Sequence, residues 1–175
     1  MSIVAPIRPL RDSDSLVSLT DLLHRAYAPL ASLGLNYTGV DQTVEETAMR
    51  ISRGKCAVAE IDGKVVGTIT VIGARPDRGT PWYREPYVAS AHQFAVEPTL
   101  QGRGIGSALM SWAESWAPDR GYSQLAVDTA ESAHHLIAYY AKRGYRFVEF
   151  AQWPGKCYRS VVYSKELPMS GRGDR

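Results

Sequence analysis

The spacing of apolar residues predicts a strand, a helix and a loop in the first part of the chain. Residues Ile3 to Leu10 favour a short strand, and Asp12 or Ser13 can cap the helix that follows. In that helix, apolar residues recur at helical spacing from Leu16 to Leu30. The next stretch, Ala31 to Gln42, contains Gly, Asn and Thr and is typical of a loop.

A capping box and a hairpin turn come next. Thr43 and Glu46, three residues apart, form the pattern that begins a helix, so we expect a short helix here. Two runs of apolar and β-branched residues follow, Lys55 to Ile61 and Val65 to Ile72. Asp62-Gly63 joins them and suits the positive φ angles of a tight turn, which predicts an antiparallel pair.

Strands and helices alternate in the second half of the chain. Residues Gly73 to Tyr87 combine three prolines with three aromatic residues, and they predict a long loop that is a candidate for function. Strands are expected at Val88 to Val96 and Ser123 to Asp128. Helices are expected from Gly104 to Trp116 and from Ser132 to Arg143.

The last two predicted strands complete a mixed sheet. They cover Tyr145 to Ala151 and Cys157 to Lys165. Because a hairpin occurs early and β-α-β connections occur late, the order of elements predicts an α+β fold. Its central sheet is expected to be mixed, mostly antiparallel, with helices on both faces. We expect a single domain over residues 1–168 and a disordered tail at 169–175.

Composition and charge exclude several classes of protein. The 175 residues are 45% hydrophobic and 22% charged, with a net charge of +2, which excludes a disordered chain and a polybasic nucleic-acid binder. No window reaches the ~18 to 20 apolar residues that cross a bilayer. Cys56 and Cys157 lie far apart without clustered histidines, so neither a metal site nor a disulfide framework is indicated. We expect a cytoplasmic protein with no nucleic-acid or membrane partner.

The segment Gln101 to Gly106 is the strongest candidate for a ligand site. It reads Gln-Gly-Arg-Gly-Ile-Gly and lies between a predicted strand and a predicted helix. Glycines let successive backbone N–H groups converge, and the start of the helix adds the positive end of its dipole. The segment therefore favours a phosphate anion, and a pyrophosphate fits it.

Two other interpretations of this loop remain open at this point. Gly102-x-Gly104-x-x-Ser107 approximates a dinucleotide-binding fingerprint, and Asp128 could serve as its ribose acid. Such a fingerprint normally follows the first strand of a parallel array, whereas an antiparallel hairpin precedes this one. The second alternative is a helix start built on tight-turn glycines with no ligand.

Two motifs resemble those of the GNAT superfamily of N-acetyltransferases. The run Val96-x-Pro98-x-x-Gln101-x-x-Gly104-x-Gly106 looks like the acetyl-CoA motif of that family, and Tyr140-x-x-x-Gly144-Tyr145 looks like its closing Y-x-x-x-G-F pattern. Both occur in the family's order, and the resemblance covers residues Ile7 to Leu167. Two departures are an alanine, Ala133, where the family often has asparagine, and Tyr145 in place of phenylalanine.

The resemblance implies an enzyme that transfers an acetyl group from acetyl-CoA to a primary amine. The residues it assigns to the cofactor are Phe94, Ala95, Val96, Gln101, Gly102, Arg103, Gly104, Ile105, Gly106 and Ser107. Backbone N–H groups of Phe94 and Val96 are expected to stabilise the oxyanion and to pair with the pantetheine arm. The alternative from another class is a non-catalytic acyl-CoA-binding module.

The resemblance also implies two catalytic side chains. Tyr140 is the expected general acid for the departing thiolate, because its distance to Gly144 matches the motif and that of Tyr139 does not. The structural alternative is a core tyrosine whose hydroxyl only finds a partner.

The proton of the amine needs an acceptor, and His92 is the leading candidate. On a regular strand, His92 would point to the same side as Ser90 and Phe94, toward a cleft. Glu97, a bound water, or a histidine with only a structural role are the alternatives.

The acceptor pocket is expected to lie between residues 33–46 and 73–87. Its substrate-binding residues are predicted to be Tyr37, Trp82 and Tyr83. Asp41, Glu45 and Glu46 could attract a cationic amine, although both glutamates also suit the first turn of a helix. A small-molecule amine is favoured over a protein, and the chain is expected to be a monomer or a homodimer.

Overall fold

The computed structural model describes residues 5–169, and within them seven strands form one sheet in the order β1-β2-β3-β4-β5-β7-β6. The strands are β1 (Ile7–Pro9), β2 (Lys55–Ile61), β3 (Lys64–Ile72), β4 (Val88–Val96), β5 (Gln124–Ala130), β6 (Arg146–Ala151) and β7 (Ser160–Glu166). All neighbours pair antiparallel except β4 and β5, which are parallel. The predicted mixed, mostly antiparallel sheet is confirmed. The predicted tail lies outside the described residues from position 170 onward.

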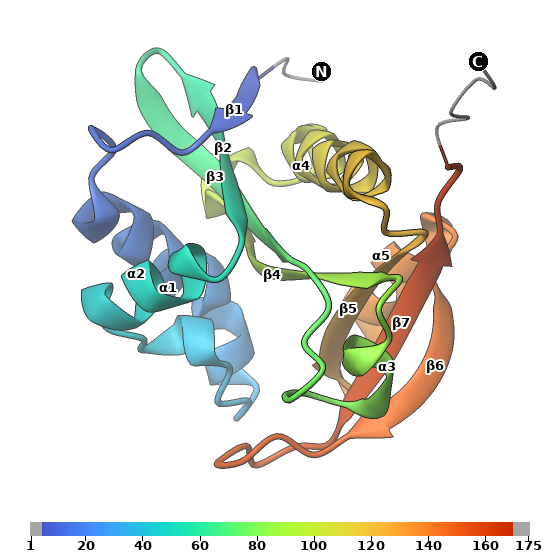
Figure 1. Ribbon diagram of the computed structural model, residues 1–175. Coiled ribbons are helices and arrows are strands. Elements are labelled where there is room, and N and C mark those ends of the chain that lie inside the picture. The colour runs from blue at the N-terminus through green and yellow to red at the C-terminus, as the bar shows by residue number, and fades with distance from the viewer. Residues whose placement is uncertain (1–4, 170–175) are drawn as a thin grey trace, which may run out of the picture.

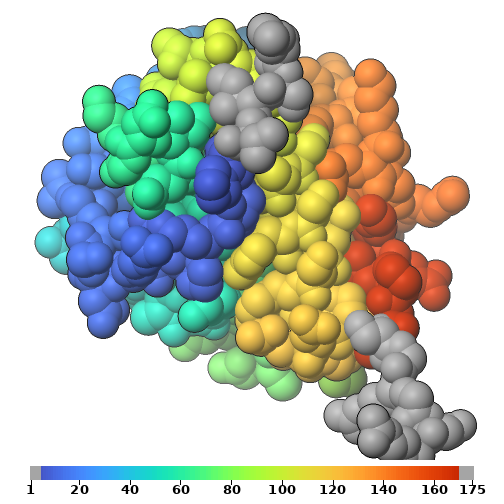
Figure 2. Space-filling model, turned by 90° about the horizontal axis from the view of Figure 1, so that it is seen from above, coloured from blue at the N-terminus to red at the C-terminus, as the bar shows by residue number. Residues whose placement is uncertain are grey.

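Helices cover both faces of the sheet, as predicted (Figure 1). The helices are α1 (Leu16–Ser32), α2 (Val44–Ser52), α3 (Pro81–Arg84), α4 (Ile105–Trp116) and α5 (His134–Lys142). The first two lie on one face, and α4 and α5 lie on the other. Viewed from above, α4 lies between the N-terminal elements and the C-terminal strands (Figure 2). Within residues 5–169, no helix is long and apolar enough to cross a membrane.

The apolar stripes read from the sequence are the buried faces of these helices. On one face, Leu19 and Leu22 of α1 pack with Val58 of β2. On the other face, Leu109 of α4 packs with Ile69 of β3, and both are fully buried. Each such side chain contributes roughly 1.5 to 3 kcal/mol by leaving water. The sheet is therefore fixed between two apolar layers.

Local signals account for two of the element boundaries. Thr43 and Glu46 form the predicted capping box at the start of α2. Asp62 and Gly63 adopt φ angles of 49° and 73°, which confirms the predicted hairpin turn.

The predicted cap of α1 was wrong. Ser15 caps this helix, and its hydroxyl accepts from the N–H of Ser18 at 3.2 Å. Asp12 and Ser13 lie in the preceding turn, which is closed by a backbone hydrogen bond from Asp14 to Arg11. The helix therefore begins later than the sequence pattern predicted.

Other boundaries also differ from the predictions, and the helix predicted from Ser132 begins at His134. The predicted loop from Gly73 to Tyr87 contains α3, which starts at Pro81 after the cap residue Thr80. β5 extends past Asp128 to Ala130 because it pairs along its full length with β7. β7 begins at Ser160 rather than Cys157 because the backbone before it bonds to another loop.

Candidate active site

β4 and β5 separate in the middle of the sheet. Their parallel pairing ends at Ser90 and Ala126, although β4 continues to Val96 and β5 to Ala130. The two strands visibly diverge beyond that point (Figure 1). We call the space between residues 91–96 and 127–130 the wedge. The sheet is therefore open between β4 and β5 at this point.

A β-bulge at Gln93 interrupts the alternation of side chains between the two faces of the sheet along β4. Gln93 has a φ of 49°, and the register of β4 against β3 shifts by one residue there. Its buried side chain accepts a hydrogen bond from Gln42 at 2.7 Å, which holds the bulge in place. His92 stays on the face of Ser90, with 2.7 Å between Ser90 Oγ and His92 Nε2. Phe94 is turned to the α4 face, so the predicted common side of His92 and Phe94 was wrong.

The bulge also decides where the backbone N–H groups of β4 point. The N–H of Glu97 donates to the carbonyl of Val66 on β3 at 2.8 Å. Since N–H groups alternate along a strand, those of Val96 and Phe94 point away from β3 and toward the wedge. The carbonyl of Val96 also faces away from β3, where it accepts from Gln101 Nε2 at 3.1 Å.

The glycine loop after β4 has the conformation that an anion site requires. Gly102 and Gly104 have φ angles of 74° and 95°, which residues with a Cβ disfavour. Gly104 caps α4 without a side-chain hydrogen bond, so the first N–H groups of α4 are left for a ligand. A Cβ on Gly106 would lie 3.2 Å from the Phe94 ring, so the loop packs tightly on β4.

A cavity of about 360 Å³, the glycine-loop cavity, joins this loop to the wedge. Of the predicted cofactor residues, those lining it are Phe94, Ala95, Val96, Gln101, Gly102, Gly104, Gly106 and Ser107. Ile105 instead buries its side chain in the core, with 1% of it exposed. Arg103 is exposed and is not among the residues that line this cavity.

A second cavity of about 330 Å³, the arginine cavity, lies on the other side of the wedge. Its walls come from the α1–α2 connection, the β3–β4 connection, the C-terminal end of α2 and the β6–β7 loop. Tyr37 and Tyr83 line it, as predicted for an acceptor pocket. Trp82 is not in its lining, and its indole packs edge-on against the ring of Tyr87, with ring centroids 5.9 Å apart.

Five residues line both cavities, so the two spaces meet in the wedge. They are Tyr27, Tyr37, Phe94, Asp128 and Tyr140. Two substrates that enter from opposite sides would therefore come together at these side chains.

Tyr140 is placed at this junction by α5. Its ring is buried, and its hydroxyl forms no hydrogen bond with any other described residue. Burial raises its pKa well above the ordinary value of a tyrosine, so the hydroxyl keeps its proton. Tyr139 lies instead against Phe94 with its ring stacked at 6.1 Å, and it lines only the glycine-loop cavity.

His92 lines the arginine cavity from β4. Burial lowers its pKa to about 3, and the positive charges of Arg50, Arg75 and Arg53 contribute to the decrease. The imidazole is therefore neutral at physiological pH. Glu97, the alternative base, forms an ion pair with Arg25 at 2.8 Å and lines neither cavity.

Asp128 is a residue of this site whose role the sequence analysis missed. The sequence pattern suggested it only as an acid that would bind the ribose of a dinucleotide. It lies in the part of β5 that no longer pairs with β4, and it accepts from Tyr83 Oη at 2.7 Å and from Trp153 Nε1 at 2.9 Å. Burial raises its pKa, and these two hydrogen bonds act in the opposite direction. The arrangement provides an oriented carboxylate at the junction of both cavities.

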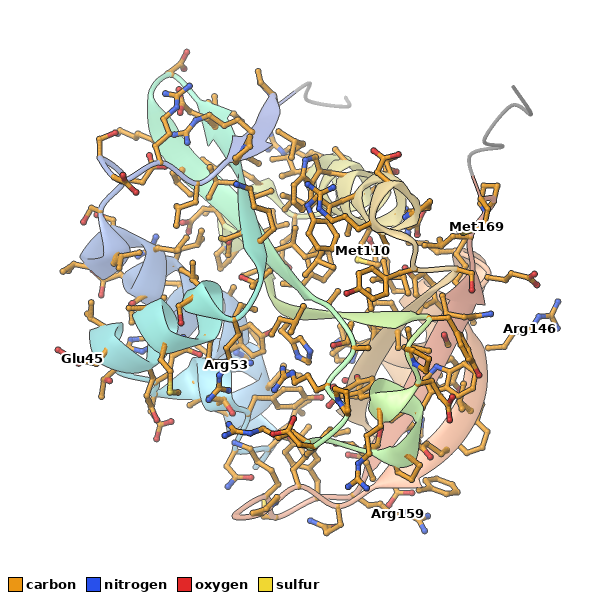
Figure 3. The ribbon with its side chains drawn as sticks, in the orientation of Figure 1. Glu45, Arg53, Met110, Arg146, Arg159 and Met169 are labelled. Carbon is orange, nitrogen blue, oxygen red and sulfur yellow. The ribbon has the colours of Figure 1, made fainter. Side chains whose placement is uncertain are left out.

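The sequence analysis also missed a group of basic residues. Arg50, Arg53, Arg75 and Lys156 line the arginine cavity. Three different segments supply them, so no local motif could have indicated the cluster. Glu45, predicted to attract a cationic amine, lies on the outer edge of α2 and points away from Arg53 (Figure 3). Glu46 is used by the capping box, and Asp41 is exposed outside the lining of the cavity.

Comparison with known families decides among the interpretations of the loop. The family described as "Acetyltransferase (GNAT) family" matches residues 18–145, which include the wedge, the glycine loop and Tyr140. The chain belongs to this family. Its members use acetyl-CoA, so this GNAT protein is an acyltransferase and acetyl-CoA is its cosubstrate. The dinucleotide interpretation is excluded, and Asp128 is held by Tyr83 and Trp153 rather than placed for a ribose.

Known relatives extend this comparison. The chain is 30% identical over 163 residues to "S-(2-succino)cysteine N-acetyltransferase" of Bacillus subtilis, covering 90% of this chain and 92% of the relative. It is 28% identical over 135 residues to "S-alkylcysteine N-acetyltransferase" of the same organism, covering 73% and 71%. A GNAT acetyltransferase from Elizabethkingia anophelis, solved with acetyl-CoA bound, has the same fold. Its TM-score is 0.66 at 19% identity, over 93% of this chain and 97% of that one. Acetyl transfer to an amine is the activity that these relatives support.

Proposed function

We propose that this GNAT protein acetylates the primary amine of a small amino-acid-like molecule by direct attack on the thioester of acetyl-CoA. The observation that carries the proposal is the meeting of the two cavities at Tyr140 and Asp128. The glycine-loop cavity would hold acetyl-CoA, and the arginine cavity would hold the acceptor. Their junction brings the amine to the thioester.

The walls of the arginine cavity favour a small acceptor over a protein. Asn36 lies in the α1–α2 connection. Its side chain donates to the carbonyl of Gly155 at 2.9 Å and accepts from the N–H of Cys157 at 3.0 Å. Its own carbonyl accepts from Lys156 Nζ at 2.7 Å. Tyr37 stacks on Tyr158 with ring centroids 5.0 Å apart. The β6–β7 loop is thus fastened to the α1–α2 connection, and these contacts narrow the cavity on that side.

The relatives suggest the type of acceptor. Both curated relatives are named for the N-acetylation of a cysteine that carries a substituent on sulfur. An S-substituted cysteine has one primary amine next to a carboxylate. We therefore propose the α-amine of such an amino acid as the acceptor.

The residues of the wedge can support each step of the proposed transfer. The neutral amine attacks the thioester carbonyl carbon, and a C–N bond forms while the C–S bond breaks. The N–H groups of Phe94 and Val96 donate to the carbonyl oxygen as it becomes negative. The Tyr140 hydroxyl donates its proton to the departing thiolate, and the proton lost by the amine is taken up on the acceptor side.

We assign that proton to His92 and assign the orientation of the amine to Asp128. His92 is uncharged at neutral pH, so one ring nitrogen has a lone pair for the proton, and its lowered pKa makes it a weak base until the nearby arginine charges are neutralised. When ionised, Asp128 has the charge that attracts an ammonium, and each of its oxygens has a single donor from the protein. Both oxygens therefore retain lone pairs for an incoming amine.

The test is a thiol-release assay with acetyl-CoA and a panel of acceptors. The panel would contain S-substituted cysteines, a polyamine and a peptide with a free N-terminus. We expect release of CoA thiol with the cysteine derivatives and formation of their N-acetyl products by mass spectrometry. Preferential acetylation of the peptide or the polyamine would contradict the proposed acceptor.

A further inference from the structure

We propose that the arginine cavity selects acceptors that carry a second carboxylate on the side chain, in addition to the one beside the amine. Arg53 and Arg75 would bind the distal carboxylate, and Arg50 would bind the one beside the amine. This inference rests on the proposed function, because it concerns the acceptor side of the same site.

The wall of the arginine cavity carries mostly positive charges. Arg50, Arg53, Arg75 and Lys156 line it, and Asp128 is the only acidic residue among the described residues of its lining. None of the three arginines forms an ion pair with an acidic residue in the part of the chain that the structure describes. By contrast, Arg8 and Arg143 outside the site are paired with carboxylates.

Arg50 and Arg75 are partly buried, and leaving such charges without an ion pair costs stability, which points to a ligand that compensates them. Arg50 is half-buried, and its Nη1 donates to the neutral Oε1 of Gln42 at 2.7 Å. Burial lowers the pKa of Arg50, and the charge of Arg53 adds to the effect. Burial also lowers the pKa of Arg75, with contributions from Arg53, Arg78 and Arg50. Guanidinium groups bind carboxylates through two parallel hydrogen bonds. A dicarboxylate acceptor would therefore give these arginines the ion-pair partners that the described residues do not provide.

The positions of the arginines separate two carboxylate sites. Arg50 lines only the arginine cavity, whereas Arg53 and Arg75 also line an adjoining outer cavity with Arg78. Arg53 is exposed and follows the last residue of α2, on the side of that helix nearer the centre of the view in Figure 3. An amine held at Asp128 would thus place its α-carboxylate toward Arg50 and extend its side chain toward the outer pair.

The same charges affect His92. Arg50, Arg75 and Arg53 all lower its pKa, so acceptor carboxylates that neutralise them would raise it and make His92 a stronger base. Other titratable groups that line the cavity around His92 are Tyr27, Tyr37, Tyr83, Asp128, Tyr140, Lys156 and Tyr158. A dicarboxylate acceptor would then assist its own deprotonation.

A matched pair of acceptors tests the inference. S-(2-carboxyethyl)cysteine and S-propylcysteine have side chains of similar length, and only the first ends in a carboxylate. We expect the native enzyme to prefer the first by about 10-fold or more in kcat/KM. Arg75→Gln and Arg53→Gln should each reduce that preference by several-fold or more, because kcat/KM for the carboxylate acceptor falls relative to that for S-propylcysteine. Arg146→Gln, at an exposed position on the far edge of the sheet (Figure 3), is the control and should leave both values unchanged.

Binding to the CoA-saturated protein by calorimetry gives a second measurement, and melting temperatures verify that each variant is folded. Equal kcat/KM values for the two acceptors in the native enzyme would overturn the inference and leave the proposed function intact. Equal losses on both acceptors in Arg75→Gln would overturn it too. If neither acceptor binds or is acetylated while CoA still stabilises the protein, the proposed function and the inference both fail.

Discussion

The hydroxyl of Tyr83 donates a hydrogen bond of 2.7 Å to Oδ1 of Asp128, from α3 to the end of β5 that has separated from β4. Tyr83 was predicted to offer its ring to an amine. Its hydroxyl instead orients a carboxylate, and Trp153 Nε1 holds the other oxygen at 2.9 Å. The acceptor side of the site therefore depends on loops that meet only in the folded chain.

Tyr140→Phe tests the proposed general acid. The change keeps the ring and its packing but removes the proton donor, so we expect kcat to fall by ~10² or more with little change in the affinity for CoA. Tyr139→Phe is the matched control, because Tyr139 lines only the glycine-loop cavity, and it should change kcat little. Turnover and melting temperature would be measured at saturating acetyl-CoA. A fully active Tyr140→Phe enzyme would remove Tyr140 from the mechanism.

His92→Gln and Asp128→Asn separate the roles of base and amine anchor. We expect His92→Gln to lower kcat by ~10², with part of the rate recovered at high pH, where more of the amine is already neutral. Asp128→Asn should mainly raise KM for the acceptor, because it removes the charge that attracts the ammonium. Steady-state kinetics from pH 6 to 10 would measure both effects. The opposite pattern, with kcat lost in Asp128→Asn, would make Asp128 the base.

Gly104→Ala tests the glycine loop against a matched glycine elsewhere. Gly104 and Gly121 have φ angles of 95° and 87°, so an alanine strains both positions and costs on the order of 1 kcal/mol. Of these two glycines, Gly104 lines the glycine-loop cavity and Gly121 does not, so we expect Gly104→Ala but not Gly121→Ala to weaken CoA binding. Calorimetric titration with CoA measures the difference. Equal CoA affinity in the two variants would contradict the assignment of the loop.

The lowered pKa of His92 predicts a pH-dependent stability of the free protein. An unfolded histidine takes up a proton near pH 6.5, whereas folded His92 does so only at about pH 3. Between these values the unfolded state binds more protons, so stability falls as the pH falls. His92→Gln should lose less melting temperature between pH 7 and 4.5 than the native protein. The exposed His134→Gln should behave like the native protein, and identical profiles for all three would show that His92 is not held neutral.

Local patterns were sufficient for most of the elements. The capping box at Thr43, the turn at Asp62-Gly63 and the apolar stripe of α4 depend on residues within a few positions of one another. The glycine loop belongs to the same class, since its conformation comes from its own residues. α3 was missed because a single turn has too few residues for a periodic signal.

The sequence by itself determined the family, the mixed sheet, the glycine loop and the position of Tyr140 relative to Gly144. The tertiary structure alone decided the faces of β4, because the bulge at Gln93 depends on Gln42, 51 residues earlier in the chain. It also brought Arg50, Arg75 and Asp128 to one cavity from α2, the β3–β4 connection and β5. A charge cluster of this kind has no periodicity or spacing in the sequence, because its members become neighbours only when the sheet and its loops are packed.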